Sequence, residues 1–191
     1  MYIHMTIFFT ASYLGKKKYQ KLYDLVRSTL KSMSVDLISP EEGNYQAVLD
    51  PHTRELITDP QLLHYEAIRQ GIHTADVIII EASEPDFQLG HEASLAMTEK
   101  KPVLVLSTTT DYGARIHHSF FTGKLYTPQT IGPILQDFLS TARERTQPKR
   151  FNMFLYPSQI EYLTTAEKRS GINMSEYLRH LINLKKKTDR S

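Results

Sequence analysis

Apolar residues in this chain fall into short continuous runs, separated by longer segments in which apolar residues recur at helical spacing. The short runs predict strands over residues 6–10, 35–39, 77–80, 103–106 and 124–127. The helically spaced segments predict helices over residues 17–33, 61–74, 92–99 and 128–145. Strands that alternate with helices in this way predict an α/β fold, a Rossmann-like (flavodoxin-like) parallel sheet with helices on both faces.

Two carboxylates follow the third predicted strand, in the acidic segment that ends at residue 92. We expect the loop to turn at Gly90 and a helix to begin at Glu92. Ligands bind parallel sheets in the crevice at the carboxyl ends of the strands, which is where Asp86 and Glu92 fall. Two carboxylates in one crevice are candidates for a nucleophile and for an acid or base.

Two further segments lack a clear period. Residues 40–60 are rich in Pro, Gly, Asn and Asp, and we predict a long loop there, of the kind that often serves as a lid or a binding loop. Residues 107–123 are predicted to be a second irregular stretch.

Beyond a polar linker at residues 146–149 the pattern changes. Apolar residues stand at every second position from 151 to 155, which is the period of a strand. Helices are predicted over residues 157–170 and, after a capping-box-like start, over 173–187. About 40 residues cannot bury a core alone, so we expect the module formed by residues 150–191 to dimerise.

The composition narrows the class of protein. The chain has 191 residues, enough for one domain over residues 1–145 and a small appendage. It has no cysteine, which excludes disulfides and thiol catalysis, and no His or acidic spacing that predicts a metal site. The apolar runs are too short to span a bilayer, and the first residues lack signal-peptide features, so we expect a cytoplasmic protein with no membrane partner.

The net charge of +2 conceals an asymmetry along the chain. Residues 1–145 carry 14 Lys and Arg against 17 Asp and Glu, a net −3, whereas residues 146–191 carry 9 against 4, a net +5. A mildly acidic body with a basic tail predicts two modules that have different partners.

The C-terminal segment, residues 150–187, resembles the ribbon-helix-helix family of DNA-binding dimers. The alternating strand, the core spacing of Leu155, Ile160 and Leu163, and the stretch Gly171-Ile-Asn-Met-Ser-Glu-Tyr-Leu-Arg179 carry the resemblance. In that family two strands pair into a ribbon that enters the major groove. The resemblance therefore implies a homodimer or higher oligomer that binds nucleic acid. The alternative is a dimerisation clip that binds no DNA.

The same resemblance implies which residues meet the DNA. They lie on the outward side of the strand and at the start of the second helix: Arg150, Asn152, Phe154, Asn173 and Ser175. Arg and Asn can read guanine and adenine edges, and a helix N-terminus can hold a phosphate. Phe154 departs from the usual polar residue, and would either contact a thymine methyl group or weaken the reading of sequence.

Most of residues 1–145 resembles the nucleoside 2-deoxyribosyltransferase superfamily, which includes deoxynucleotide N-hydrolases. Four pieces carry the resemblance in the family's order: Phe9-Thr-Ala-Ser-Tyr13, Gly71-Ile-His-Thr-Ala-Asp76, Asp86-x5-Glu92 with Gly90 inside it, and Lys101-Pro-Val-Leu-Val-Leu106. The resemblance implies cleavage of an N-glycosidic bond in a nucleoside, a nucleotide or NAD, by hydrolysis or transfer, without a cofactor.

The resemblance also assigns roles to residues. Glu92 matches the family's nucleophile, Asp86 a residue near the base, and Tyr13 a residue that positions the sugar or Glu92. A place in the first turn of a helix would favour the ionised form of Glu92. Substrate contacts are implied for Ser12, Gly15, Ser83, Gly90 and, from a neighbouring subunit, His118 or the adjacent Ser119.

Plainer interpretations of the same residues stay open. Glu92 can be a surface residue that compensates a helix dipole, Asp86 a helix N-cap, and Tyr13 a packing residue. Ile68 stands where the family usually carries an Asp that helps to protonate the base or bind the sugar. Asp86 replaces the small hydroxyl residue of members that need a 5′-phosphate, so we expect a neutral 5′ end or a larger ligand such as NAD.

Three functional hypotheses follow. The first is an N-glycosidase or deoxyribosyltransferase-like enzyme on a DNA-binding dimer, a fusion that resembles toxic effectors of phage-defence systems. The second is a catalytically impaired, nucleotide-sensing transcriptional regulator, which Ile68 favours and the intact Asp86 and Glu92 oppose. The third is a structural dimeric partner that binds no ligand.

Overall fold

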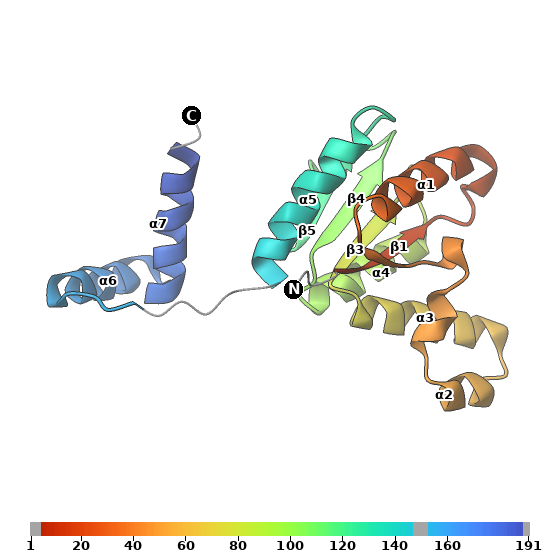
Figure 1. Ribbon diagram of the computed structural model, residues 1–191, viewed down its shortest axis with the longest axis horizontal. Helices are drawn as coiled ribbons and strands as arrows, with labels where there is room; N and C mark the ends of the chain where they lie inside the picture. The colour runs from red at the N-terminus through yellow and green to blue at the C-terminus, as the bar shows by residue number, and fades with distance from the viewer. Residues whose placement is uncertain (1–4, 147–152, 189–191) are drawn as a thin grey trace. The chain divides into compact units, whose positions relative to one another are not determined.

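The chain divides into two compact units, Met1–Pro148 and Lys149–Ser191. A computed structural model gives the fold of residues 5–146 and 153–188. Figure 1 shows the elements of both units in chain order. Within these two ranges, no helix combines the length and the apolar character that crossing a membrane requires.

A sheet of five strands, all parallel, forms the centre of the first unit, in the order β2-β1-β3-β4-β5. The strands are β1 Thr6–Ala11, β2 Asp36–Ile38, β3 Val77–Glu81, β4 Val103–Ser107 and β5 Phe121–Leu125. The flavodoxin-like doubly wound fold has this order. The predicted α/β fold class is therefore confirmed.

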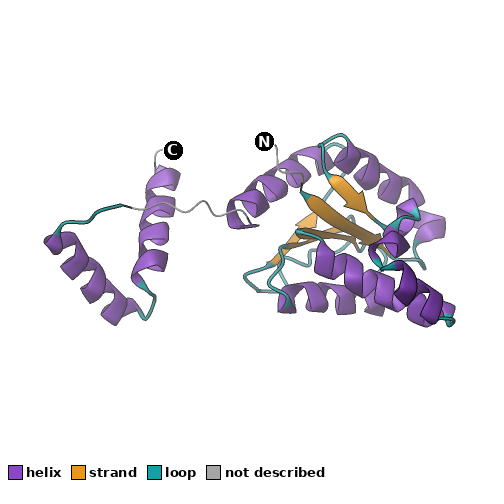
Figure 2. Cartoon of the chain, turned by 60° about the horizontal axis from the view of Figure 1, so that its bottom comes forward, coloured by secondary structure: helices purple, strands orange, loops and turns teal. Residues whose placement is uncertain are grey.

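Helices cover both faces of the sheet, as Figure 2 shows. One face packs against α1 (Lys16–Lys31) and α5 (Ile131–Thr146), and the other against α3 (Pro60–Thr74) and α4 (Phe87–Thr98). Neighbouring residues of a strand point to opposite faces, so Phe9 joins the first core and Phe8 the second. Burial on both faces explains why the central strands are continuous apolar runs rather than alternating ones.

The strand order places a crevice at the carboxyl ends of β1 and β3. The chain leaves β1 toward one neighbour, β2, and returns on the other side as β3. This reversal is the switch point at which doubly wound sheets bind ligands. The segments that follow the two strands, residues 12–15 and 82–86, therefore border the place where a functional site is expected.

The segment over residues 40–60 is more ordered than predicted. It contains two 3-10 helices, η1 (Pro40–Glu42) and η2 (Tyr45–Val48), and a short helix α2 (Pro51–Leu56). The side chain of Asp50 accepts a hydrogen bond from the Thr53 amide, and Pro51 occupies the first helical position. These are helix start signals, so the prediction of a plain loop was wrong.

The last strand begins earlier than the sequence indicated. We predicted residues 124–127, but β5 starts at Phe121 and pairs with β4 through Gly123 opposite Val105. A side chain at Gly123 would meet the backbone of the 107–121 loop, because its Cβ would lie only 2.7 Å from the carbonyl carbon of Tyr112. The close approach of this loop therefore requires glycine at position 123.

The second unit is a pair of helices, α6 (Pro157–Ser170) and α7 (Met174–Thr188), as predicted. Gly171 ends α6 in the left-handed region with φ +72°, and Asn173 Oδ1 accepts a hydrogen bond from the Glu176 amide at the start of α7. Of the strand predicted over residues 151–155, only 153–155 are described, and these form no strand within the chain. Phe154 is fully exposed there.

We expect Gly123→Ala to destabilise the first unit by about 1–3 kcal/mol, because the added methyl group meets backbone atoms that cannot rotate away. The matched control is Gly90→Ala in the interior of α4, where a Cβ meets nothing within 4 Å. Alanine has the higher helix propensity, so the control variant should keep or raise stability. Thermal or urea unfolding would measure both, and equal stability of the two variants would contradict the assigned contact.

Candidate active site

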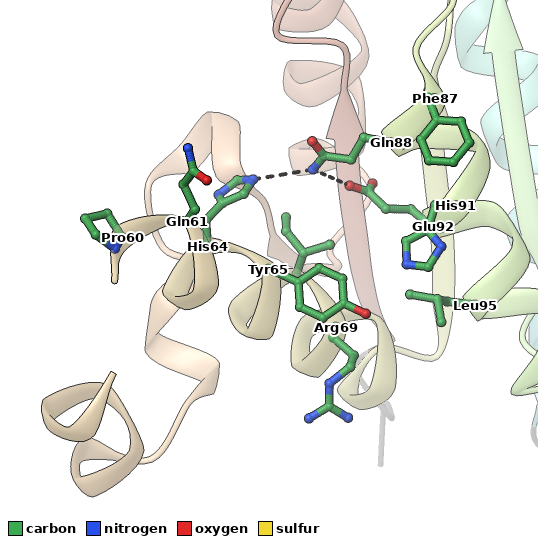
Figure 3. Close-up of a pocket in the computed structure, with 11 residues that line it drawn as sticks. Pro60, Gln61, His64, Tyr65, Arg69, Phe87, Gln88, His91, Glu92 and Leu95 are labelled. Atoms are coloured by element: carbon green, nitrogen blue, oxygen red, sulfur yellow. Dashed lines mark hydrogen bonds between the residues drawn. The ribbon is translucent and has the colours of Figure 1, made fainter. Parts of the chain in front are cut away.

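A cavity of about 490 Å³ lies between α3 and α4. Its walls are drawn in Figure 3 and comprise Pro60, Gln61, His64, Tyr65, Ile68, Arg69, Phe87, Gln88, His91, Glu92 and Leu95. This volume is typical of small-molecule binding sites. A mainly apolar and aromatic surface with a few polar groups is also typical of such sites. Glu92 is its buried carboxyl group, with 1% of its surface exposed.

Glu92 does not lie in the first turn of its helix. We predicted that the helix begins at Glu92 after a turn at Gly90, but α4 begins at Phe87 and contains Gly90 in its interior. Asp86 provides the N-cap, so Glu92 is already in the second turn. The helix dipole acts mainly on the first turn. The expectation that it favours an ionised Glu92 was therefore wrong.

Burial instead raises the pKa of Glu92 to about 7, and the charge of Asp86 adds to this effect. Gln88 and the hydroxyl of Thr10 act in the opposite direction by stabilising the ionised form. Gln88 Nε2 donates to Glu92 Oε1 over 2.9 Å, while Oε2 is buried without a hydrogen-bond partner among the described residues. One carboxyl oxygen is therefore held in place, and the other accepts no hydrogen bond from the described residues while it is shielded from solvent.

Asp86 joins two loops. Its Oδ1 accepts a hydrogen bond from the Gln88 amide at 3.0 Å, and its Oδ2 accepts one from Ser12 Oγ at 2.9 Å. The interpretation of Asp86 as a helix N-cap is thus confirmed. The second bond connects the turn after β1 to the start of α4, and it engages Ser12, which is buried.

The other residues predicted after β1 lie close to this junction. Tyr13 is 79% exposed, so it is not a packing residue of the core, and Lys16 Nζ lies 5.4 Å from the centre of its ring. Gly15 is buried, and a Cβ there would stand only 2.7 Å from Glu84 Cβ. Glycine therefore allows the loops after β1 and β3 to approach each other.

Of the residues predicted from the sequence to contact substrate or act in catalysis, only Glu92 lines the Glu92 cavity; Ser12, Tyr13, Gly15, Ser83, Asp86, Gly90 and His118 do not. Asp86 and Gly90 line a separate cavity of about 330 Å³. Ser83 is buried in a polar cluster, where its Oγ donates to Glu81 and accepts from the Thr108 amide at 2.9 Å. His118 lines a separate hollow of about 390 Å³ with His117 and Lys124. Neither residue lines the Glu92 cavity within this chain.

A buried carboxyl group that the sequence analysis missed is Glu81, the last residue of β3. It is fully buried, and its Oε1 accepts hydrogen bonds from Tyr126 at 3.0 Å and from Ser83. Burial raises the pKa of Glu81 and outweighs these hydrogen bonds. The available signal was an acidic residue directly after the apolar run 77–80, which we treated as part of a loop.

The second group that the sequence analysis missed is His64, which links α3 to Glu92 through the side chain of Gln88. His64 Nε2 lies 3.4 Å from Gln88 Nε2, and its Nδ1 lies 2.9 Å from the hydroxyl of Tyr45 on η2. Burial lowers the pKa of His64. His64 and Ile68 are four residues apart on α3, as are Gln88 and Glu92 on α4, so each pair shares a helix face. The four-residue spacing in the sequence could have indicated that the two members of each pair lie on the same helix face.

The described residues contain no group of three or more His, Asp or Glu side chains arranged to hold a metal ion. No protein-family model matches the sequence, and no curated protein matches it. Among solved structures, the chain is similar to a CMP N-glycosidase of Clostridium botulinum, with 14% identity over 68% of this chain and 98% of that chain, at a TM-score of 0.47. We therefore base the functional proposal on the geometry of the Glu92 cavity.

We expect Glu92→Gln to stabilise the protein at pH 8 but not at pH 4.5. The folded-state pKa of about 7 exceeds the usual 4.5, so stability present below pH 4.5 is lost as the pH rises through 7. At 1.36 kcal/mol per pKa unit the loss is about 3 kcal/mol, which glutamine would avoid. Thermal unfolding at both pH values measures the stability difference between Glu92→Gln and the wild type. The exposed Glu55→Gln controls for the loss of one negative charge. An equal gain in stability at pH 4.5 would contradict the raised pKa of Glu92.

Proposed function

We propose that the first unit is an N-glycosidase or deoxyribosyltransferase-like enzyme, and that Glu92 attacks the anomeric carbon of a nucleoside, a nucleotide or NAD. The observation that carries this proposal is the carboxyl of Glu92, which is 1% exposed, lines a cavity of about 490 Å³ and leaves Oε2 without a partner among the described residues. The hydroxyl of Thr10, next to the end of β1, stabilises the ionised Glu92, so this carboxyl lies near the switch point of the sheet, where ligands bind in this fold.

The chemistry requires what Glu92 offers. Breaking an N-glycosidic bond builds positive charge on the anomeric carbon, and a carboxylate beneath that carbon stabilises the charge or forms a glycosyl-enzyme. Gln88 holds Oε1 at 2.9 Å, which leaves Oε2 as the attacking oxygen. Burial raises the pKa of Glu92 to about 7, so a large fraction of molecules carry the nucleophilic anion at neutral pH.

The lining of the cavity favours a flat, uncharged ligand group. Tyr65 and His91 stack with ring centres 6.1 Å apart, and Phe87 is 93% exposed beside them, so aromatic surface is available to a nucleobase. Arg69 also lines the cavity, but Glu66 neutralises it through an ion pair of 2.6 Å. These features, with the carboxylate of Asp86, support a neutral 5′ end rather than a 5′-monophosphate.

Release of free base tests this proposal. We expect the wild type to release base from at least one member of a panel of nucleosides, their 5′-monophosphates and NAD, and Glu92→Gln to lower that rate at least about a thousandfold. Glu84→Gln, in the loop after β3 but outside the cavity, is the matched control and should retain activity. Chromatography of the released base measures all three proteins; full activity of Glu92→Gln would overturn the proposal.

The second candidate function is regulation through DNA, with the first unit as a nucleotide sensor, and the features of the C-terminal unit favour it. Residues 146–191 carry a net charge of +5, and α7 exposes Ile182 and Leu184, 63% and 49% of whose surfaces are uncovered. We propose that this unit is a ribbon-helix-helix module in which two copies pair and bind DNA. The predicted contacts Arg150 and Asn152 lie outside the described residues. In an enzyme, the same module would carry the activity to nucleic acid, as a phage-defence effector would require.

We expect the full chain to bind duplex DNA as a dimer, with an affinity that falls about a hundredfold between 50 and 200 mM salt because phosphate contacts release counterions. Ile182→Asp should convert the dimer to a monomer and weaken DNA binding, whereas His180→Asp on the same helix controls for the added charge. Sedimentation and fluorescence anisotropy measure the two effects. A wild type that is monomeric and does not bind DNA would rule out this second candidate function.

A further inference from the structure

The leaving base must acquire a proton, and the cavity offers few groups that can supply one. When the C1′–N bond breaks, the electron pair moves to the base, so cleavage accelerates if an acid protonates a ring nitrogen or carbonyl oxygen. Ile68 faces the cavity where the related family carries a carboxyl group, and it cannot donate. Besides Glu92, the lining groups that bear acidic protons are His64, His91, Tyr65 and Arg69.

The four groups differ in their partners, exposure and position, and therefore in how well they could donate a proton to the base. Arg69 is bound to Glu66, and the hydrogen bond and charge of that carboxylate raise its pKa, so it retains its proton. His91 is exposed and stacks on Tyr65, which places both rings where a base would stack. His64 is half-buried and projects from α3 on the opposite side of the cavity from Glu92, as Figure 3 shows.

His64 is held in a fixed orientation toward Glu92. Gln88 Nε2 lies 2.9 Å from Glu92 Oε1 and 3.4 Å from His64 Nε2, so the imidazole and the carboxylate are two hydrogen-bond lengths apart. On the other side of the ring, the Tyr45 hydroxyl lies 2.9 Å from Nδ1 and itself accepts a hydrogen bond from Gln46. A base on the carbon that Glu92 attacks is therefore within reach of His64 Nε2.

We propose that His64 is the catalytic acid of this site and donates the Nε2 proton to the leaving base. This inference rests on the proposed glycosidase function. In the neutral ring, the Gln88 amide donates to Nε2, so Nδ1 carries the proton and donates to Tyr45. Protonation adds a hydrogen at Nε2 and leaves the Tyr45 contact unchanged. The long contact with Gln88 is then replaced by the base.

The proton balance closes with water as the second reactant. In the first step Glu92 Oε2 bonds to C1′, the C1′–N bond breaks, and the proton of His64 moves to the base. In the second step neutral His64 takes a proton from a water molecule that attacks C1′, and the bond from C1′ to Glu92 breaks. His64 is again protonated, Glu92 is again ionised, and one water has been consumed.

The pH dependence follows from the groups that face this pair. His64 contacts Tyr45 from η2 and Gln88 from α4. Glu92 and His91 from α4, and Tyr65 and Arg69 from its own helix, line the same cavity. Burial lowers the pKa of His64 and raises that of Glu92 to about 7. The reactive form has a proton on His64 and none on Glu92, so activity should peak between the two pKa values and fall above about 7. Without His64, activity should rise through pH 7 and level off.

The test compares two leaving groups on His64→Gln. The substrates are the nucleoside that the wild type cleaves fastest and the p-nitrophenyl glycoside of the same sugar, whose leaving group departs as an anion without protonation. We expect nucleoside cleavage to fall about 10²–10⁴-fold, and nitrophenyl release to stay within about threefold of the wild type. His73→Gln, on the same helix α3 but exposed and outside the cavity lining, is the matched control and should change nucleoside cleavage only a few-fold.

The possible results distinguish a role of His64 as the acid from a structural role, and both from failure of the glycosidase proposal. Selective loss on the nucleoside, with the change from a bell-shaped to a rising pH profile, supports His64 as the acid. Equal loss on both substrates assigns His64 a structural role, and no loss on the nucleoside removes it from the reaction; either result overturns the inference while the glycosidase stands. A wild type that cleaves neither substrate overturns the proposed function, and this inference with it.

Discussion

The hydrogen bond from Ser12 Oγ to Asp86 Oδ2 determines how the site is assembled. The same carboxylate caps α4 through the Gln88 amide, so one side chain ties the turn after β1 to the first turn of the helix. Once Asp86 is the cap, Gln88 and Glu92 fall one turn apart on the face of α4 that meets the cavity. The carboxyl that we propose as nucleophile is thus positioned by another carboxyl, whose own oxygens are already engaged.

Burial then sets the chemistry of the cavity. Removal from water raises the pKa of the Glu92 carboxyl to about 7 and lowers that of the His64 imidazole, so the pKa of the carboxyl lies above that of the imidazole. Gln88 stands between them and can donate to both when both are unprotonated. A catalytic acid or base works best when its pKa lies near the pH of the reaction. The destabilising burial of Glu92 is therefore intelligible as a functional feature.

The sequence allowed the sheet to be predicted well and the site only in part. Continuous apolar runs flanked by turn residues identified the central strands, because burial on both faces leaves little room for other residue types. The start of α4 was missed because Gly90 was interpreted as a turn, whereas the Asp86 cap decided where the helix begins. The order within residues 40–60 was missed because Pro and Asp occur both in loops and at helix starts.

The same limit applies to the site residues. Asp86, Glu92 and Ile68 follow from local pattern and resemblance, but His64 gains its meaning from Gln88, 24 residues away, and from Tyr45, 19 residues away. Glu81 likewise depends on Tyr126. Contacts between distant elements depend on the packing of helices on the sheet, so they cannot be predicted from the spacing of residues along the sequence.

The polar cluster around Ser83 has a consequence for how a ligand comes and goes. Ser83 Oγ accepts from the Thr108 amide at 2.9 Å, and the Ser83 carbonyl accepts from Thr109 Oγ1 at 3.1 Å, so the loops after β3 and β4 are joined. The wall of the Glu92 cavity formed by α3 contacts α4 through the longer 3.4 Å contact of His64 with Gln88 and through the stack of Tyr65 on His91. We expect a ligand to enter and leave by displacement of the α3 wall. The residence time of a product would accordingly depend on residues 40–60, which brace that wall, rather than on the loop that carries Asp86.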